Sequence, residues 1–156
     1  TLTYFSGINS SFVFSNFRLM GSYFHGMSKP NLDQQGMVKD ISRLTSSSFN
    51  LTLYKTGLLT KADSFGFSVS QPLKLESGEI NFSLPYRRTV KKEVLFNDFS
   101  ASMEASGRQV DMEFIYSTPI RKGYLRSRIG VSKDQGHISS DRLEPFFETS
   151  WEFVTF

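Results

Sequence analysis

The chain of 156 residues contains no cysteine. This absence excludes a disulfide scaffold, a thiolate zinc site and a cysteine nucleophile. The sequence also has no run of about 18 apolar residues, which is the length that a membrane-spanning helix needs. Strands that cross a membrane are half polar, so the lack of long apolar runs does not exclude a protein that crosses a membrane with β-strands.

Neither sign of charge is in large excess. Eighteen basic and fifteen acidic side chains leave a net charge of +3, and no run of basic residues is longer than the pairs Arg87-Arg88 and Lys91-Lys92. A nucleic-acid partner is therefore not expected. The length suits one domain, residues 1–156. The chain begins with Thr1 and shows no signal peptide, so we expect a mature product or a piece of a longer polypeptide.

Aromatic residues are abundant, with 16 Phe, 6 Tyr and 1 Trp. Apolar and polar residues alternate through much of the sequence, which is typical of strands with one apolar face. The apolar positions of these stretches are Phe49, Leu51, Leu53, Phe65, Phe67, Val69, Leu73, Leu75, Ile80, Phe82, Leu84, Tyr86, Val110, Met112, Phe114, Tyr116, Phe147, Trp151 and Phe153. Gln71 interrupts the pattern in one stretch.

The alternation predicts strands at residues 3–8, 12–25, 47–56, 64–75, 79–87, 94–104, 109–117 and 122–132, with a ninth candidate at 146–155. Only residues 31–45 have helical spacing, and a strand entry or loop suits that length equally well. The sequence therefore predicts an all-β fold, an antiparallel barrel or barrel-like meander of about eight to nine strands. A two-layer β-sandwich is the alternative, because both architectures need strands with one apolar face.

Turn-forming residues separate the expected strands. Residues 76–79, 105–108 and 118–121 are short enough for hairpins, and Lys133 to Gly136 opens a longer loop. If Thr118–Arg121 is a four-residue turn, Glu113 faces Arg126 and Asp111 faces Arg128. These charges could line a barrel interior as a ladder or form an ordinary solvated surface.

The polar faces of several expected strands carry small uncharged residues, such as Gly66, Ser68 and Ser70. Soluble sheets more often place Lys and Glu there, whereas a narrow barrel interior accommodates small polar side chains. The chain ends on Phe156 after Trp151 and Phe153, a pattern found in bacterial outer-membrane barrels. A core strand that happens to stop there is the other interpretation.

The sequence contains few residues suited to catalysis. His25 and His137 are its two histidines, and there is no Gly-x-Ser-x-Gly segment and no phosphate-binding loop. The carboxylate pairs Asp111/Glu113 and Glu148/Glu152 lie on expected strands, where a structural role is favoured. We therefore predict no catalytic residue, no cofactor and no metal site.

Several ordered segments carry a family resemblance. They are Phe65–Gly78, which contains Ser-Gln-Pro-Leu-Lys-Leu-Glu-Ser-Gly, Phe82-Ser83-Leu84-Pro85, Ala105–Asp111, Gln135-Gly136-His137-Ile138, and the strand with Trp151 before Phe156. In this order, from about Gly36 to Phe156, the chain resembles the autotransporter-like C-terminal region of bacterial subtilisin-like serine proteases. Alanine replaces proline at position 105, and glutamine replaces proline at position 135.

The resemblance implies a non-catalytic C-terminal β-domain of a secreted or surface-exposed protease, which supports export, anchoring or folding of the protease. The expected partners are the upstream protease domain of the same polypeptide and outer-membrane lipid, and the expected location is the bacterial outer membrane or the cell surface. The Asp-Thr-Gly, His-Gly-Thr-His and Gly-Thr-Ser-Met-Ala segments of subtilisins are absent. No catalytic residue is therefore transferred from the family.

Overall fold

The computed structural model describes residues 2–31, 36–120 and 123–153, and these form an antiparallel all-β structure, as expected. One short 3-10 helix, η1, covers Gln135–His137. The strands are β1 (Leu2–Phe14), β2 (Phe17–Lys29), β3 (Val38–Ile41), β4 (Leu44–Thr56), β5 (Ser64–Ser77), β6 (Glu79–Arg88), β7 (Val94–Ser102), β8 (Val110–Ile120), β9 (Gly123–Lys133) and β10 (Leu143–Phe153).

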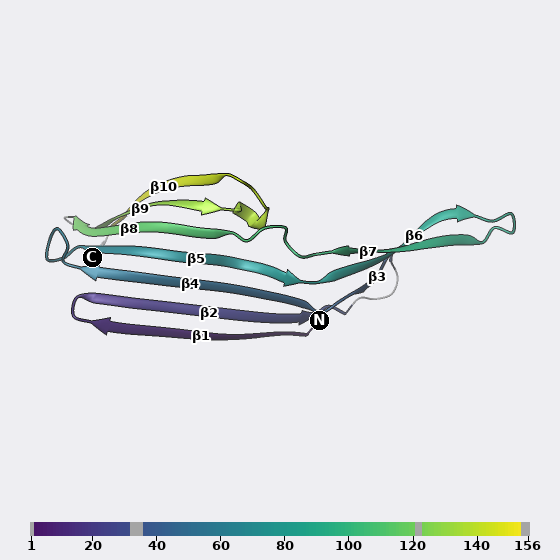
Figure 1. Cartoon of the computed structure of the whole chain (residues 1–156), viewed down its shortest axis with the longest axis horizontal. Coiled ribbons are helices and arrows are strands. Elements are labelled where there is room, and N and C mark those ends of the chain that lie inside the picture. Colours follow the sequence, from purple (N-terminus) through teal and green to yellow (C-terminus); the bar gives the residue numbers. More distant parts are fainter. Residues whose placement is uncertain (1, 32–35, 121–122, 154–156) are drawn as a thin grey trace. The chain divides into compact units, whose positions relative to one another are not determined.

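The strands form two sheets. A seven-stranded sheet has the order β1-β2-β4-β5-β8-β9-β10, and a three-stranded sheet has the order β3-β6-β7 (Figure 1). Strands β1 and β10 are the two edges of the larger sheet, so this sheet is open in the part of the chain that the structure describes. Its strands have 11 to 14 residues, about twice the usual length of five or six in globular proteins.

Contacts along the chain define two compact units. The first takes residues 1–6, 25–47 and 75–105, and contains the three-stranded sheet. Within it the rings of Phe82 and Phe99 stack at 5.1 Å across the β6–β7 pair, and Lys39 of β3 forms a 2.6 Å ion pair with Asp98 of β7. This ion pair and a hydrogen bond from Ser83 lower the pKa of Asp98 below its usual value.

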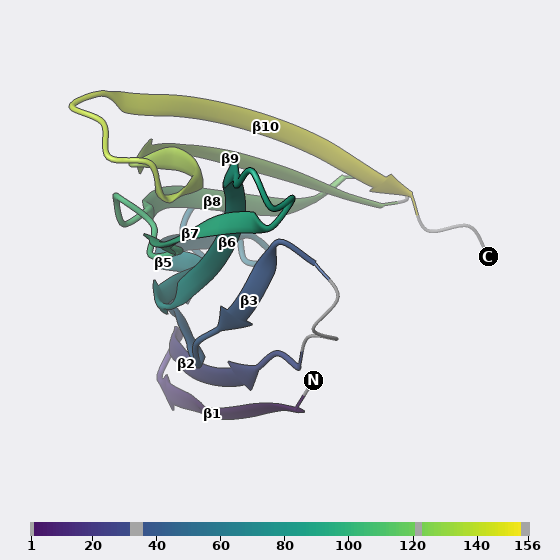
Figure 2. The same ribbon diagram turned by 90° about the vertical axis from the view of Figure 1, so that its right-hand side faces the viewer.

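The second unit takes residues 7–24, 48–74 and 106–156. It includes β8, β9 and β10, which pair in register along their whole lengths. Figure 2 shows the long β9–β10 pair and the loop that joins its two strands. This loop, residues 134–142, confirms the longer connection expected after Lys133.

Two of the three expected hairpins are wrong, because the chain changes sheet at those positions. Strand β5 pairs with β8, and β6 pairs with β7, so neither Gly78 nor residues 105–108 join neighbouring strands.

The third expected hairpin is confirmed, since β8 and β9 pair as antiparallel neighbours, but β8 continues to Ile120, opposite Gly123, and Arg121 lies outside the described residues. The true register places Glu113 opposite Gly130 and Asp111 opposite Ser132, so the proposed facing pairs do not form. The expected register differs from the true one by an even number of residues. Because side chains alternate with a period of two, Glu113 and Arg128 still share one face.

In residues 31–45, where the spacing is helical, the described part contains a strand and not a helix. Val38–Ile41 forms strand β3, which pairs with β6, while residues 32–35 lie outside the described residues. The terminal Phe156 lies outside them as well.

The expected division at residues 9–11 is wrong, since β1 runs unbroken to Phe14 and turns at Ser15, whose φ is +54°.

Candidate functional site: the two faces of the seven-stranded sheet

Apolar side chains form continuous rows across four strands of the second unit. Phe67 of β5 is opposite Phe114 of β8, which is opposite Ile129 of β9, which is opposite Phe147 of β10. The adjacent row consists of Val69, Met112, Val131 and Pro145. We call the side of the sheet that carries these rows the apolar face. Its phenylalanines contact one another, with 5.0 Å between the ring centres of Phe67 and Phe114.

The apolar face is open. Phe147 is 71% exposed, Ile129 57% and Trp151 52%, and no large hydrophobic side chain among the described residues is buried. Soluble monomers rarely expose contiguous apolar surface of this extent, and such surfaces mark contact with a membrane or another protein. The exposed apolar face is therefore a candidate contact surface.

The opposite side, the polar face, is the buried one. Ser68 is 1% exposed, Thr52 4% and Ser132 4%. Their hydroxyl groups are hydrogen-bonded, with 2.9 Å between Thr52 Oγ1 and Ser68 Oγ, and with Ser132 donating to Asp111 Oδ1. No buried side-chain polar atom of the described residues lacks a hydrogen-bond partner. The sheet thus has the inverse of a soluble protein's distribution, with polar groups shielded and apolar groups exposed.

The charges at the centre of the polar face are paired. Arg128 donates from Nη2 to Glu113 Oε2 at 2.6 Å, and from Nε to the same oxygen at 2.8 Å. Arg128 Nη1 also reaches Glu148 Oε2 at 3.1 Å. The ladder expected from the sequence is therefore present with different partners, Glu113–Arg128–Glu148. Arg126 forms no ion pair among the described residues.

Aromatic rings cover glycines on neighbouring strands. A Cβ atom at Gly66 would lie 2.7 Å from Cε1 of Tyr54, and one at Gly130 would lie 2.6 Å from Cζ of Phe146. A ring over a glycine restores the contacts that the missing side chain would have made. The sequence indicates Gly66 only as a small polar-face residue, because the ring that covers it is on another strand.

The connections on one side of the sheet are short. Ser15 and Asn16 join β1 to β2, residues 57–63 join β4 to β5, and two residues join β8 to β9. The other connections are longer and include residues 78–109 and 134–142. At the start of β5, near the short connections, Phe65 lies opposite Tyr116 on the apolar face, and toward the end of β10 Trp151 stacks on Phe153 with 4.5 Å between ring centres.

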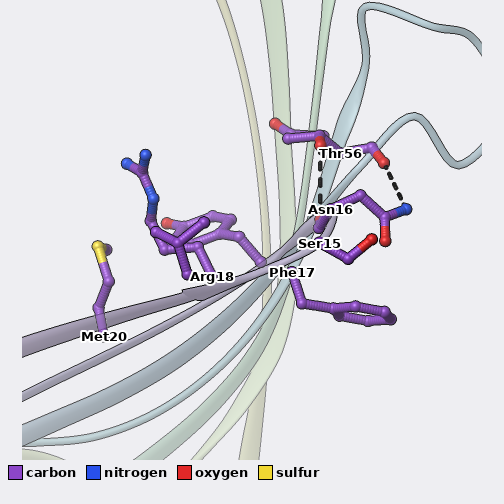
Figure 3. A pocket seen from close by; sticks show the side chains of 9 residues that line it. Ser15, Asn16, Phe17, Arg18, Met20 and Thr56 are labelled. Atoms are coloured by element: carbon purple, nitrogen blue, oxygen red, sulfur yellow. Dashed lines mark hydrogen bonds between the residues drawn. The ribbon is translucent and has the colours of Figure 1, made fainter.

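A pocket of about 460 Å³ lies beside the Ser15–Asn16 turn. Figure 3 shows Phe17 and Arg18 projecting to opposite sides of the strand, and Asn16 donating to the carbonyl oxygen of Thr56, at 3.2 Å. The lining combines Arg18 with hydroxyl groups and apolar side chains. It has no histidine or carboxylate, so it lacks the groups that acid–base catalysis uses.

Asp63 anchors the connection between β4 and β5. Its carboxylate accepts hydrogen bonds from the backbone N–H groups of Leu58, Leu59 and Thr60 and from the Tyr116 hydroxyl. Burial raises the pKa of Asp63, but these hydrogen bonds outweigh it and hold the pKa below its usual value of 3.8. Asp63 is not among the site residues expected from the sequence. Its place between Lys61-Ala62 and the start of a strand was the available signal for a loop-capping aspartate.

The two histidines lie in different surroundings. His137, in the loop between β9 and β10, accepts a hydrogen bond at Nδ1 from the Gln109 backbone N–H, and its Nε2 lies 3.1 Å from the carbonyl oxygen of Leu73. These contacts join the loop to the ends of β8 and β5. His25 lies on β2 between the exposed residues Tyr23 and Met27. Among the described residues, neither histidine side chain is hydrogen-bonded to a serine or an aspartate side chain.

The carboxylate pairs take part in separate contacts. Asp111 accepts hydrogen bonds from Gln109 and Ser132, whereas Glu113 and Glu148 bind Arg128. Among residues 2–31, 36–120 and 123–153, no group of three or more His, Asp or Glu side chains is arranged to hold a metal ion. No helix within these same ranges has the length and apolar character required to cross a membrane.

No protein-family model, curated protein or solved structure matches the chain. Its functional interpretation therefore depends on the two faces of the sheet and on the sequence segments described above.

Proposed function

We propose that the chain is a non-catalytic, membrane-embedded β-domain of the bacterial outer membrane, with the apolar face against lipid. In this proposal it supports export, anchoring or folding of a subtilisin-like serine protease, whose catalytic domain precedes it in the same polypeptide. The observation that carries the membrane part is the inverted distribution of side chains, with rows from Phe67 to Phe147 exposed and Ser68, Thr52 and Glu113 buried.

Strand length supports the same interpretation. A tilted strand needs about 9–11 residues to cross the apolar layer of a membrane, and the strands of the larger sheet have 11 to 14. Outer-membrane proteins also combine short connections on one side with longer ones on the other, and place aromatic residues at the lipid–water boundary. The short connections and the Trp151–Phe153 stack fit this arrangement.

The protease part rests on the ordered sequence segments between Gly36 and Phe156. It is tested by reading the coding sequence upstream of Thr1, where segments of the Asp-Thr-Gly, His-Gly-Thr-His and Gly-Thr-Ser-Met-Ala type are expected. An unrelated domain at that position would overturn the link to subtilisin-like proteases, and would leave the membrane part untouched.

The membrane part is tested by fluorescence of Trp151, the single tryptophan of the chain. The full chain is folded into phosphatidylcholine vesicles whose acyl chains carry bromine, a contact quencher. Since Trp151 is on the apolar face and half exposed, we expect strong quenching. Absence of quenching would instead support a soluble β-sandwich module whose apolar face is covered by protein.

A matched control reports on the other face of the same strand. Phe146 lies on the polar face of β10, opposite Gly130, and is half-buried. In a Trp151→Phe/Phe146→Trp chain the tryptophan should be shielded from the brominated acyl chains. Equal quenching in both chains would show that the two faces contact lipid alike, which contradicts an oriented, embedded sheet.

A further inference from the structure

A cluster of positive charge lies at the tip of one hairpin. Residues Tyr86 to Val94 join β6 to β7 and contain Arg87, Arg88, Lys91 and Lys92 with one acid, Glu93. These nine residues therefore carry a local charge of +3. We call this segment the basic tip.

The basic tip has a defined backbone. The N–H of Lys92 donates to the carbonyl oxygen of Thr89 at 2.9 Å, the N–H of Thr89 donates to Glu93 O at 2.8 Å, and the Thr89 hydroxyl accepts from the N–H of Glu93. Lys92 has a φ of +65°, a conformation that glycine or asparagine adopts more readily. The turn therefore holds a lysine in a left-handed conformation that glycine or asparagine adopts at lower cost.

The cations of the basic tip are exposed, and no described residue forms an ion pair with any of the four. Apolar groups lie among them. Val90 at the apex is fully exposed, and Tyr86 is 65% exposed. Cations interspersed with exposed apolar and tyrosine side chains suit an interface where phosphate groups lie beside acyl chains. A soluble polyanion would use the charges but would leave Val90 in water.

We propose that the basic tip is a docking site for a membrane surface rich in anionic, phosphate-bearing lipid headgroups. Arg and Lys side chains of the tip bind the phosphate oxygens, and Val90 inserts at the boundary with the acyl chains. The proposal is independent of whether the seven-stranded sheet spans a membrane, because it depends only on the exposed β6–β7 hairpin.

The test is flotation of the full chain, held in neutral phosphatidylcholine nanodiscs, with added vesicles of phosphatidylcholine and phosphatidylglycerol. If the chain does not enter nanodiscs, the free chain is used, so failure of the membrane-spanning proposal is seen separately. Each basic residue near an anionic surface strengthens binding by about 1 kcal/mol, roughly fivefold. We therefore expect Lys91→Gln/Lys92→Gln to weaken binding about 25-fold, and pure phosphatidylcholine vesicles not to bind.

Matched controls separate the site from general charge. Lys91→Arg/Lys92→Arg should retain binding, because it retains both charges. Lys133→Gln/Arg142→Gln removes the same charge from the exposed β9–β10 region and should change binding less than twofold. If this control loses as much as Lys91→Gln/Lys92→Gln, binding follows net charge, and the assignment to the basic tip is overturned.

A second variant separates lipid from a soluble polyanion. Val90→Ser should weaken vesicle binding roughly tenfold, the effect of losing one buried valine side chain, while leaving binding of inorganic polyphosphate unchanged. If Val90→Ser has no effect on vesicles, and polyphosphate binds as tightly as the anionic vesicles, the lipid surface is the wrong partner. Val90, Lys91 and Lys92 lie in the β6–β7 turn and Arg142 in the β9–β10 loop, and Lys133 is an exposed residue at the end of β9, so these substitutions leave the folded sheet intact.

Discussion

The Glu113→Gln substitution tests whether the polar face stabilises the sheet through a shielded charge network. The side chain of Glu113 is 12% exposed and accepts two hydrogen bonds from Arg128, whose side chain is 39% exposed. Breaking a fully buried ion pair from one side costs about 3–5 kcal/mol. Arg128 is partly solvated and retains Glu148, so we expect a smaller loss of roughly 1–2 kcal/mol in unfolding free energy.

The assay is urea unfolding of the full chain folded in detergent micelles, followed by Trp151 fluorescence. For a urea dependence of about 2 kcal/mol per molar, the expected loss lowers the midpoint by roughly 0.5–1 M. Glu148→Gln removes the outer partner of Arg128, which is 58% exposed, and should cost less than about 0.5 kcal/mol.

Glu144→Gln is the control on the same face, because Glu144 is exposed, opposite Ser132, and forms no ion pair among the described residues. It should leave the midpoint unchanged. If Glu113→Gln is also neutral, or if Glu148→Gln costs more than Glu113→Gln, the polar face is solvated, and the reasoning about a shielded network is refuted.

Three further predictions concern other elements. Gly66→Ala should lower the unfolding free energy by about 1–3 kcal/mol, since its Cβ would lie 2.7 Å from the ring of Tyr54, whereas Gly21→Ala, with 3.6 Å to its nearest atom, should be neutral in the same urea assay. Because the pKa of Asp63 is lowered in the folded chain, its stabilising effect is present above about pH 4 and is lost as the pH falls through the lowered value. Asp63→Asn should therefore remove this part of the pH dependence of the urea midpoint. An unchanged pH profile would contradict the anchoring role. His137→Ala should speed hydrogen exchange of the β9–β10 loop without affecting the short connections, and uniform protection in both proteins would show that the histidine contacts are dispensable.

Local pattern was enough to identify the strands. The alternation at Phe65–Val69 and at Val110–Tyr116 predicts strands with one apolar face, because side chains on a strand point alternately to its two sides. The sequence alone likewise shows that cysteine and a Gly-x-Ser-x-Gly segment are absent. The sequence also placed small residues such as Ser68 opposite the apolar positions, which is the basis of the polar face.

Pairing was decided only in the tertiary structure. Residues near Gly78 have the composition of a hairpin turn, yet β5 pairs with β8, because backbone hydrogen bonds can be made equally well with a strand distant in sequence. The partner of Arg128 depended on the same register, which a turn of different length shifted from Asp111 to Glu113. The alternating sequence thus determined that each strand has two unlike faces. Which face is shielded was decided by the tertiary structure, because strand alternation is the same whether the apolar side packs against protein or faces outward.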